Sequence, residues 1–84
     1  MPELAEYVTN TGTVRPGQLY RDARPTNVRT LRVDSIDELE IACTVIRQEY
    51  EGEVTTPNRV TKMTARRLTG RAFVLIGSVG EAEL

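Results

Sequence analysis

The sequence predicts an all-β domain of five short strands, and two observations carry most of that prediction. Residues 29–47 contain two runs in which apolar side chains recur at a spacing of two, the period of a half-buried strand, so they predict a β-hairpin. The apolar members of this pattern are Leu31, Val33, Leu39, Ile41, Cys43 and Val45. Residues 71–77 form an almost continuous apolar run bounded by glycines, which is typical of a buried closing strand.

A helix over residues 36–50 is the alternative for the second half of this segment, and it would make the fold class α+β. Ser35 and Glu38 form a Ser-x-x-Glu capping box, and apolar residues follow it at helical spacing. Against the helix, Ile41 and Val45 would face water, and residues 44–46 are a β-branched run that suits a pleated strand. The strand is therefore favoured.

Shorter patterns define the N-terminal and middle elements. Residues 1–16 mix proline, glycine and asparagine with little periodicity and predict a flexible arm. Residues 17–22 predict the first strand, and the loop after it is rich in turn-forming residues. Residues 49–57 place three glutamates around Gly52 and predict a long, exposed acidic loop.

The C-terminal third predicts two strands separated by one helical turn. Residues 59–65 alternate again and predict the fourth strand. Residues 66–70 predict a single helical turn that places Leu68 in the core, directly before the closing strand of residues 71–77. Residues 78–84 contain two glutamates and predict a flexible acidic tail.

Length and composition indicate one small core. A chain of 84 residues buries a smaller share of its surface than a larger domain does, so a single domain is expected over residues 17–77. Its expected buried residues are Leu31, Val33, Ile41, Cys43, Val45, Phe73 and Leu75. A single cysteine excludes an intrachain disulfide, and no apolar run resembles a signal peptide or spans a bilayer. A cytoplasmic protein without a membrane partner is expected.

No motif of catalysis or cofactor binding is present. Histidine is absent and the cysteine is single, which excludes a His/Cys zinc site and a Cys-His nucleophile. No glycine pattern forms a phosphate cradle. Neighbouring acids such as Asp37 and Glu38 lie in a predicted turn without a second group that would tune a pKa. We therefore expect no enzyme activity, no cofactor, no metal and no small-molecule substrate.

The charged residues are unevenly distributed. All 11 Lys and Arg lie in residues 15–71, which hold 8 of the 12 acids, so this body carries a net charge of +3 between acidic ends. Ten of these bases are arginine, whose planar guanidinium suits bidentate contacts with phosphate or carboxylate.

The predicted elements resemble an SH3-like barrel, because there are five short strands and a helical turn lies between the fourth and the fifth. A second resemblance rests on one pattern: Gly17-x-x-Tyr20-x-Asp22, Pro25, Arg29-x-Leu31-x-Val33, Arg59-x-Thr61-x-Met63, Arg67-Leu68 and Phe73. This pattern resembles short, largely uncharacterised proteins of actinobacteria, their phages and mobile elements. In place of their tight hairpin between strands three and four, this chain has the longer predicted loop of residues 49–57. The resemblance implies an accessory or regulatory binder.

The candidate site is a group of arginines near the helical turn. Arg66, Arg67 and Arg71 lie within six residues of one another, and the first loop adds Arg21 and Arg24. Such guanidiniums contact phosphates, so they predict a surface that binds nucleic acid. The alternative is that their stems cover the end of the barrel while their heads pair with nearby acids.

Tyr20 completes the candidate site, with two interpretations. Its ring is able to stack on a base or a partner's proline, or to cap the core with its hydroxyl at the rim. For the whole domain, the alternative function is a protein-interaction module that uses the acidic loop, a sheet edge or the arm. A phage or mobile-element protein acting on a host protein would be one example.

Overall fold

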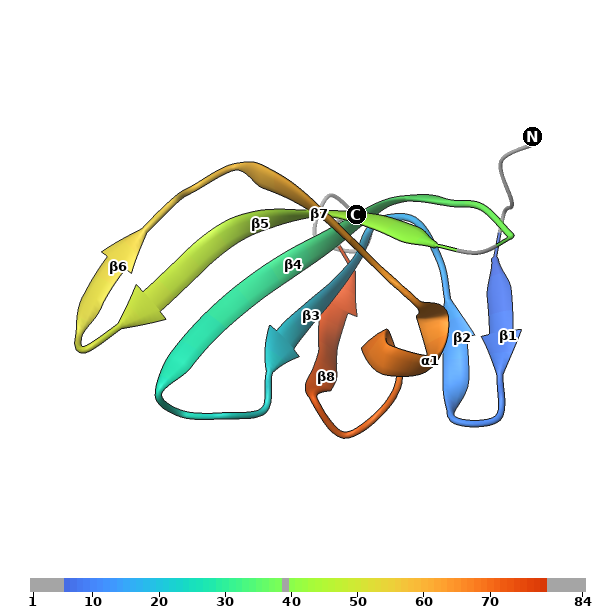
Figure 1. The fold of residues 1–84 in the computed structure, drawn as a ribbon, viewed down its shortest axis with the longest axis horizontal. Coiled ribbons are helices and arrows are strands. Elements are labelled where there is room, and N and C mark those ends of the chain that lie inside the picture. The colour runs from blue at the N-terminus through green and yellow to red at the C-terminus, as the bar shows by residue number, and fades with distance from the viewer. Residues whose placement is uncertain (1–5, 39, 79–84) are drawn as a thin grey trace.

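The computed structural model describes residues 6–38 and 40–78, which form eight strands and one short helix. The elements are β1 (Tyr7–Thr9), β2 (Gly12–Val14), β3 (Gln18–Asp22), β4 (Asn27–Ile36), β5 (Ile41–Tyr50), β6 (Glu53–Thr55), β7 (Arg59–Met63), α1 (Ala65–Leu68) and β8 (Phe73–Ser78). The predicted fold class is confirmed, because the described chain is mostly antiparallel β-sheet (Figure 1).

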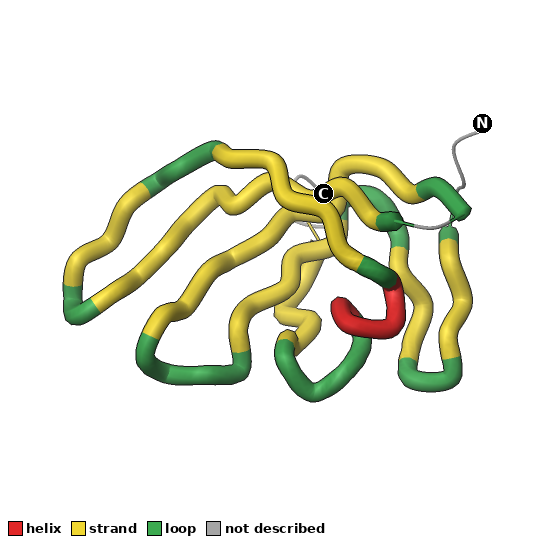
Figure 2. Tube along the Cα trace, in the orientation of Figure 1, coloured by secondary structure: helices red, strands yellow, loops and turns green. Residues whose placement is uncertain are grey.

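The larger sheet is organised around the long hairpin of β4 and β5. β3 pairs with β4, and β8 returns to pair with β3, so the order is β6-β5-β4-β3-β8. β7 pairs with the first half of β5, and β6 pairs with its end (Figure 2). All five predicted strands are present as β3, β4, β5, β7 and β8.

The alternative helix over residues 36–50 is wrong. Residues 41–50 form β5, whose backbone pairs with β4 along one side and with β7 and β6 along the other. A strand paired on both sides satisfies its backbone hydrogen bonds in the sheet. It also buries Ile41, Cys43 and Val45, which alternate along it.

The sheet does not close into the SH3-like barrel that the predicted elements resemble, because β7 and β8 are not paired with each other in the described chain. The connection between them forms α1, and its buried residues Ala65 and Leu68 belong to the core. The predicted helical turn with a buried Leu68 is confirmed. Apolar side chains of α1 therefore cover the core where a barrel would close by strand pairing.

One face of the sheet carries the core, and we call it the inner face. Directly paired residues share a face, so Leu31 and Val33 of β4 lie on the same side as Val45 and Cys43 of β5. The core consists of Val14, Tyr20, Leu31, Val33, Ile36, Ile41, Cys43, Val45, Met63, Ala65, Leu68 and Phe73.

Six of the seven predicted core residues are buried, and the prediction for Leu75 is wrong. Leu75 is 51% exposed because β8 is an edge strand whose outer side has no neighbouring strand among the described residues. The other residues of the hairpin pattern are buried as predicted, except Leu39, which lies outside the described residues.

The predicted arm of residues 1–16 differs from the structure where it is described. Residues 7–14 form the β1–β2 hairpin, and Val14 is fully buried in the core. The hydroxyls of Thr9 and Thr11 lie 3.0 and 2.7 Å from the Thr69 hydroxyl, which follows α1. The hairpin thus packs beside the helix (Figure 1). Residues 1–5 lie outside the described residues.

The predicted acidic loop of residues 49–57 is mostly a tight hairpin. Glu51 and Gly52 have φ values of 50° and 83°, and Tyr50 pairs with Glu53 across them. Two central residues with positive φ are the requirement of a type I′ turn, which matches the twist of paired strands. The segment is mostly exposed, as predicted, but residues 49–50 and 53–55 belong to β5 and β6 of the sheet. Of the predicted tail, Ser78 ends β8, and residues 79–84 lie outside the described residues.

Candidate functional site

The inner face changes from apolar to polar along its length. On β3 and β4, the positions that follow the core in the same alternation are Asp22 and Arg29. On β5 the alternation shifts at Ile46, and Gln48 lies on this face because it pairs directly with Arg29. Arg59 of β7 pairs with Val45 and so lies on the same face. Polar side chains therefore continue the surface on which the core is built.

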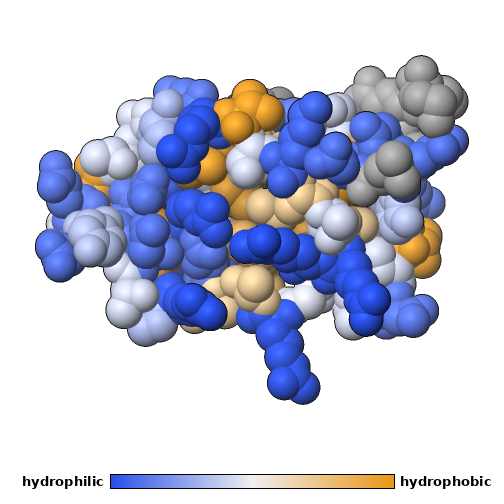
Figure 3. All heavy atoms as spheres, in the orientation of Figure 1, coloured by the Kyte–Doolittle hydropathy of each residue, from blue (hydrophilic) through white to orange (hydrophobic). Residues whose placement is uncertain are grey.

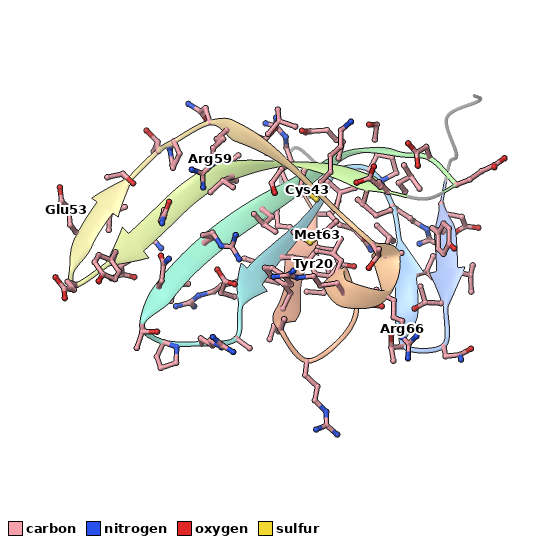
Figure 4. All side chains as sticks on the ribbon, viewed as in Figure 1. Tyr20, Cys43, Glu53, Arg59, Met63 and Arg66 are labelled. Carbon is pink, nitrogen blue, oxygen red and sulfur yellow. The ribbon has the colours of Figure 1, made fainter. Side chains whose placement is uncertain are left out.

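This polar end contains a pocket of about 340 Å³, which we call the arginine pocket. Its lining residues are Asp22, Arg24, Thr26, Asn27, Arg29, Gln48, Arg59, Arg67, Ala72 and Phe73. Four guanidiniums thus border one space with a single carboxylate. In Figure 4, Arg59 lies over β5, away from the core residues Tyr20, Cys43 and Met63.

Asp22 and Arg29 form the ordered part of the pocket. The Asp22 carboxylate accepts hydrogen bonds from the Arg29 backbone N–H at 2.8 Å, from Nε at 2.9 Å and from Nη2 at 3.2 Å. The guanidinium carbon of Arg29 also lies 5.6 Å from the centre of the Phe73 ring, a cation–π distance. These hydrogen bonds raise the pKa of Arg29, so its charge is retained beside the core.

The other three arginines have exposed side chains and come from three separate segments. Arg24 lies in the loop after β3, Arg59 begins β7, and Arg67 lies on α1. Within residues 6–38 and 40–78, none of the three forms an ion pair. Since Arg29 already engages the pocket's carboxylate, the three remaining charges are available to an anion.

Local structure holds Arg67 in place. The Thr64 hydroxyl accepts a hydrogen bond of 3.2 Å from the Arg67 backbone N–H and so caps α1. The next residue, Leu68, is fully buried. Because adjacent helical residues point in different directions, burial of Leu68 helps to set the direction of Arg67.

Of the six predicted site residues, Arg24 and Arg67 line the arginine pocket. Arg66 instead lines a larger pocket of about 670 Å³ between β1 and the β4–β5 turn, which also holds Asp37 and Glu38. Figure 4 shows Arg66 beside α1 and β2, far along the molecule from Arg59. The larger pocket mixes both signs of charge, so it has no clear preference for an anion.

The three other predicted site residues lie elsewhere. Arg21 pairs with Thr30 and faces away from the inner face. Arg71 is exposed in the turn before β8. Tyr20 is only 3% exposed, and its hydroxyl donates a hydrogen bond of 3.2 Å to Gln18 Oε1. Its ring is therefore a core side chain, as the second interpretation stated, and it is not available to stack on a base.

Sequence reasoning missed Arg29, Arg59, Asn27 and Gln48. The sequence could have indicated the first two. Arg29 is separated from Leu31 and Val33 by an even number of positions, and so is Arg59 from Met63, which gives each pair the same parity along its strand. Parity places a residue on the face of its buried neighbours. Clustering along the chain, which singled out Arg66 with Arg67, does not carry that information.

The described residues offer binding chemistry in this pocket. Guanidiniums with amide and hydroxyl neighbours suit phosphate or carboxylate oxygens. Among the described residues, no three His, Cys, Asp or Glu side chains lie close enough to hold a metal ion. Burial, and then the nearby Asp34 charge, raise the pKa of the Cys43 thiol to about 11, so it is protonated at neutral pH. No described helix has the length and apolar character needed to cross a membrane.

The fold and the pocket define a small antiparallel β domain with an arginine-lined surface site. Its surface in the view of Figure 1 is mainly hydrophilic, with separate apolar patches (Figure 3). No protein-family model, curated protein or solved structure matches the chain. The resemblance to short proteins of actinobacteria and their phages therefore stays a prediction.

Proposed function

We propose that this domain is a non-catalytic module that binds nucleic acid by contacting phosphates in the arginine pocket. The observation that carries the proposal is the convergence of Arg24, Arg59 and Arg67 on one pocket without an acid partner among the described residues. Arginine at such a site forms paired, planar hydrogen bonds to phosphate oxygens.

The neighbours of these arginines support a nucleic acid as the ligand. Asn27, Gln48 and Thr26 add amide and hydroxyl groups, which contact phosphates and sugars at nucleic-acid interfaces. Three available guanidiniums would neutralise about three phosphates. The logarithm of the binding constant for a single strand would then fall with the logarithm of salt concentration with a slope of about −2.

Charge reversal inside and outside the pocket tests the proposal. The pocket variant carries Arg24→Glu with Arg59→Glu. The control carries Arg21→Glu with Lys62→Glu, which makes the same change in net charge at nearby positions whose strand pairing places them on the other face. Binding is measured by fluorescence anisotropy with a labelled single-stranded oligonucleotide and with a duplex, at low and at physiological salt.

We expect the pocket variant to lose at least about tenfold in affinity and the control to stay within about threefold, because only the former loses phosphate contacts. Circular dichroism confirms that both variants are folded. The proposal is overturned if the wild type does not bind, if the pocket variant binds as tightly as the wild type, or if both variants weaken equally.

The alternative function, a protein-interaction module, draws support from a different surface. Val74, Leu75 and Ile76 of β8 are 53%, 51% and 52% exposed, and they form an apolar stretch on an edge strand. Edge strands of this kind pair with other strands. The acidic segment and the arm, which the sequence suggested for this role, form the β5–β6 and β1–β2 hairpins.

A further inference from the structure

The two long sides of the larger sheet differ in chemistry. β7 and β6 edge one side and carry charged residues such as Arg59, Lys62 and Glu53, with Pro57 between the two strands. Charged residues and proline are the usual protection of an edge strand against pairing with another chain. β8 edges the other side, and its residues FVLIGS include neither a charge nor a proline.

β8 also has an open backbone edge. Among the described residues it pairs only with β3, in a ladder whose register shifts at Ile76, so the N–H and C=O groups on its outer side have no strand partner. Three consecutive large apolar side chains, Val74 to Ile76, are about half exposed there. A free ladder edge and exposed apolar side chains are the two features that an added strand would cover.

We propose that β8 pairs antiparallel with β8 of a second copy of this chain, which forms a two-fold symmetric dimer with one continuous sheet. Among the edge strands of the larger sheet, β8 is the best match for itself, because pairing with β6 or β7 of another copy would set its apolar residues against charged ones. Self-pairing also closes after two copies, whereas β8 against a different edge would continue into a chain of molecules.

The size of this contact limits its strength. β8 has six residues, of which only Val74, Leu75 and Ile76 are exposed large apolar residues. A contact of one such strand is smaller than the roughly 800 Å² per partner of a standard stable interface. The dimer should therefore be weak and should dissociate on dilution.

The symmetry has a consequence that rests on the proposed function. A two-fold axis perpendicular to the sheet reverses the strand direction and keeps the same face on the same side. Phe73 of β8 lines the arginine pocket, so the dimer would place two arginine pockets on one face, either side of the new pairing. Two linked sites would bind one longer nucleic acid more tightly than a single site does.

Sedimentation velocity over a series of protein concentrations, without nucleic acid, tests the dimer independently of the proposed function. We expect the wild type to shift from monomer to dimer as concentration rises. Ile76→Lys should remain monomeric, because a charge would enter the apolar pairing. Val60→Lys is the matched control, since Val60 is 61% exposed on the edge strand β7, and it should dimerise like the wild type.

Single cysteines placed at 74, 75 and 76 give a second measurement in a folded background. Residues near a two-fold axis lie close to their own copies, so at least one of these variants should form an intermolecular disulfide under mild oxidation, while Val60→Cys should not. Cys43 is fully buried and does not compete. A wild type that stays monomeric up to millimolar concentration overturns the proposal. The proposal is also overturned if Ile76→Lys still dimerises while Val60→Lys does not. A disulfide cross-link that forms only at residue 60 would overturn it as well.

Discussion

Cys43 illustrates how burial decides the chemistry of a single residue. Its thiol is fully buried on the inner face, and burial followed by the Asp34 charge raises its pKa from 9.0 to about 11. The thiolate is therefore disfavoured in the folded protein, which makes Cys43 an inert apolar side chain. Tyr20 lies in the same core, and its pKa is also raised, first by burial and then by Cys43.

These pKa shifts predict a loss of stability at alkaline pH. A thiol whose pKa is higher in the folded state contributes its full stability below pH 9, and that contribution is lost as the pH rises toward 11. The loss from Cys43 should reach about 2 to 3 kcal/mol by the upper end of this range. Urea unfolding at neutral pH and at several alkaline values measures it.

The Cys43→Ala variant isolates the thiol. It should be less stable than the wild type at neutral pH, because it leaves a cavity, but its free energy of unfolding should fall less steeply between pH 9 and 11. The remaining slope then reports on Tyr20 and other groups. Equal slopes in the two proteins would contradict the assignment to Cys43.

Arg29 shows the limit of residue-level reasoning about the site. Its place on the inner face follows from its parity with Leu31, which the sequence displays. Its engagement by Asp22 depends on the register between β3 and β4, since seven residues of chain separate the two. Only that pairing shows that Arg29 forms an ion pair with Asp22, while Arg24, Arg59 and Arg67 remain available to bind an anion.

At the scale of elements, β5 combines a pattern that could be predicted with a register that could not. Its alternating core residues predicted a strand correctly, despite the capping box before it. Its pairing with β4 shifts between Thr30 and Leu31, where Ile46 on β5 has no direct partner. Such a bulge increases the local bend and twist of the strand pair. Bulges depend on the partner strand, so the sequence of β5 alone does not locate them.

The turn between β5 and β6 depends on glycine, which leads to a second prediction. Gly52 has a φ of 83°, and a Cβ there would meet no atom within 4 Å. Gly52→Ala should therefore destabilise the domain through backbone strain alone, by about 1 kcal/mol. Chemical denaturation of the variant and the wild type measures this difference.

Gly77→Ala is the matched control, because a Cβ at Gly77 also meets no atom within 4 Å and the residue has no positive φ. That substitution should be neutral or slightly stabilising. If both variants lose the same stability, the type I′ geometry at Gly52 is not the cause.

At the scale of the whole molecule, the main correction concerns what completes the core. The sheet stays open and does not close into a barrel. The apolar side chains on its inner face are covered by α1 and by the N-terminal hairpin. Val14 from β2 and Leu68 from α1 are both fully buried. The β1–β2 hairpin, which precedes residue 17, thus contributes Val14 to the same core as the larger sheet.

This arrangement predicts that the hairpin contributes to global stability. Val14→Ala should lower the free energy of unfolding by about 2 kcal/mol, because it removes fully buried methyl groups. Val8→Ala on the same hairpin should have almost no effect, since Val8 is 69% exposed. Thermal and urea unfolding of both variants and of the wild type measures the change in the free energy of unfolding. Two equally small effects would mean that the hairpin does not pack on the core.

The sequence by itself determined the fold class, the five main strands, the helical turn with Leu68 and most of the core. These features follow from local periodicity, because a strand buried on one face must alternate and a short helix must present its apolar side. Only the tertiary structure decided which segments cover the sheet, that β8 is left with an apolar edge, and that Arg24, Arg59 and Arg67 meet while Arg66 and Arg71 do not. The physical reason is that these outcomes depend on strand register and on contacts between distant segments, and the spacing of residues along one strand carries no information about either.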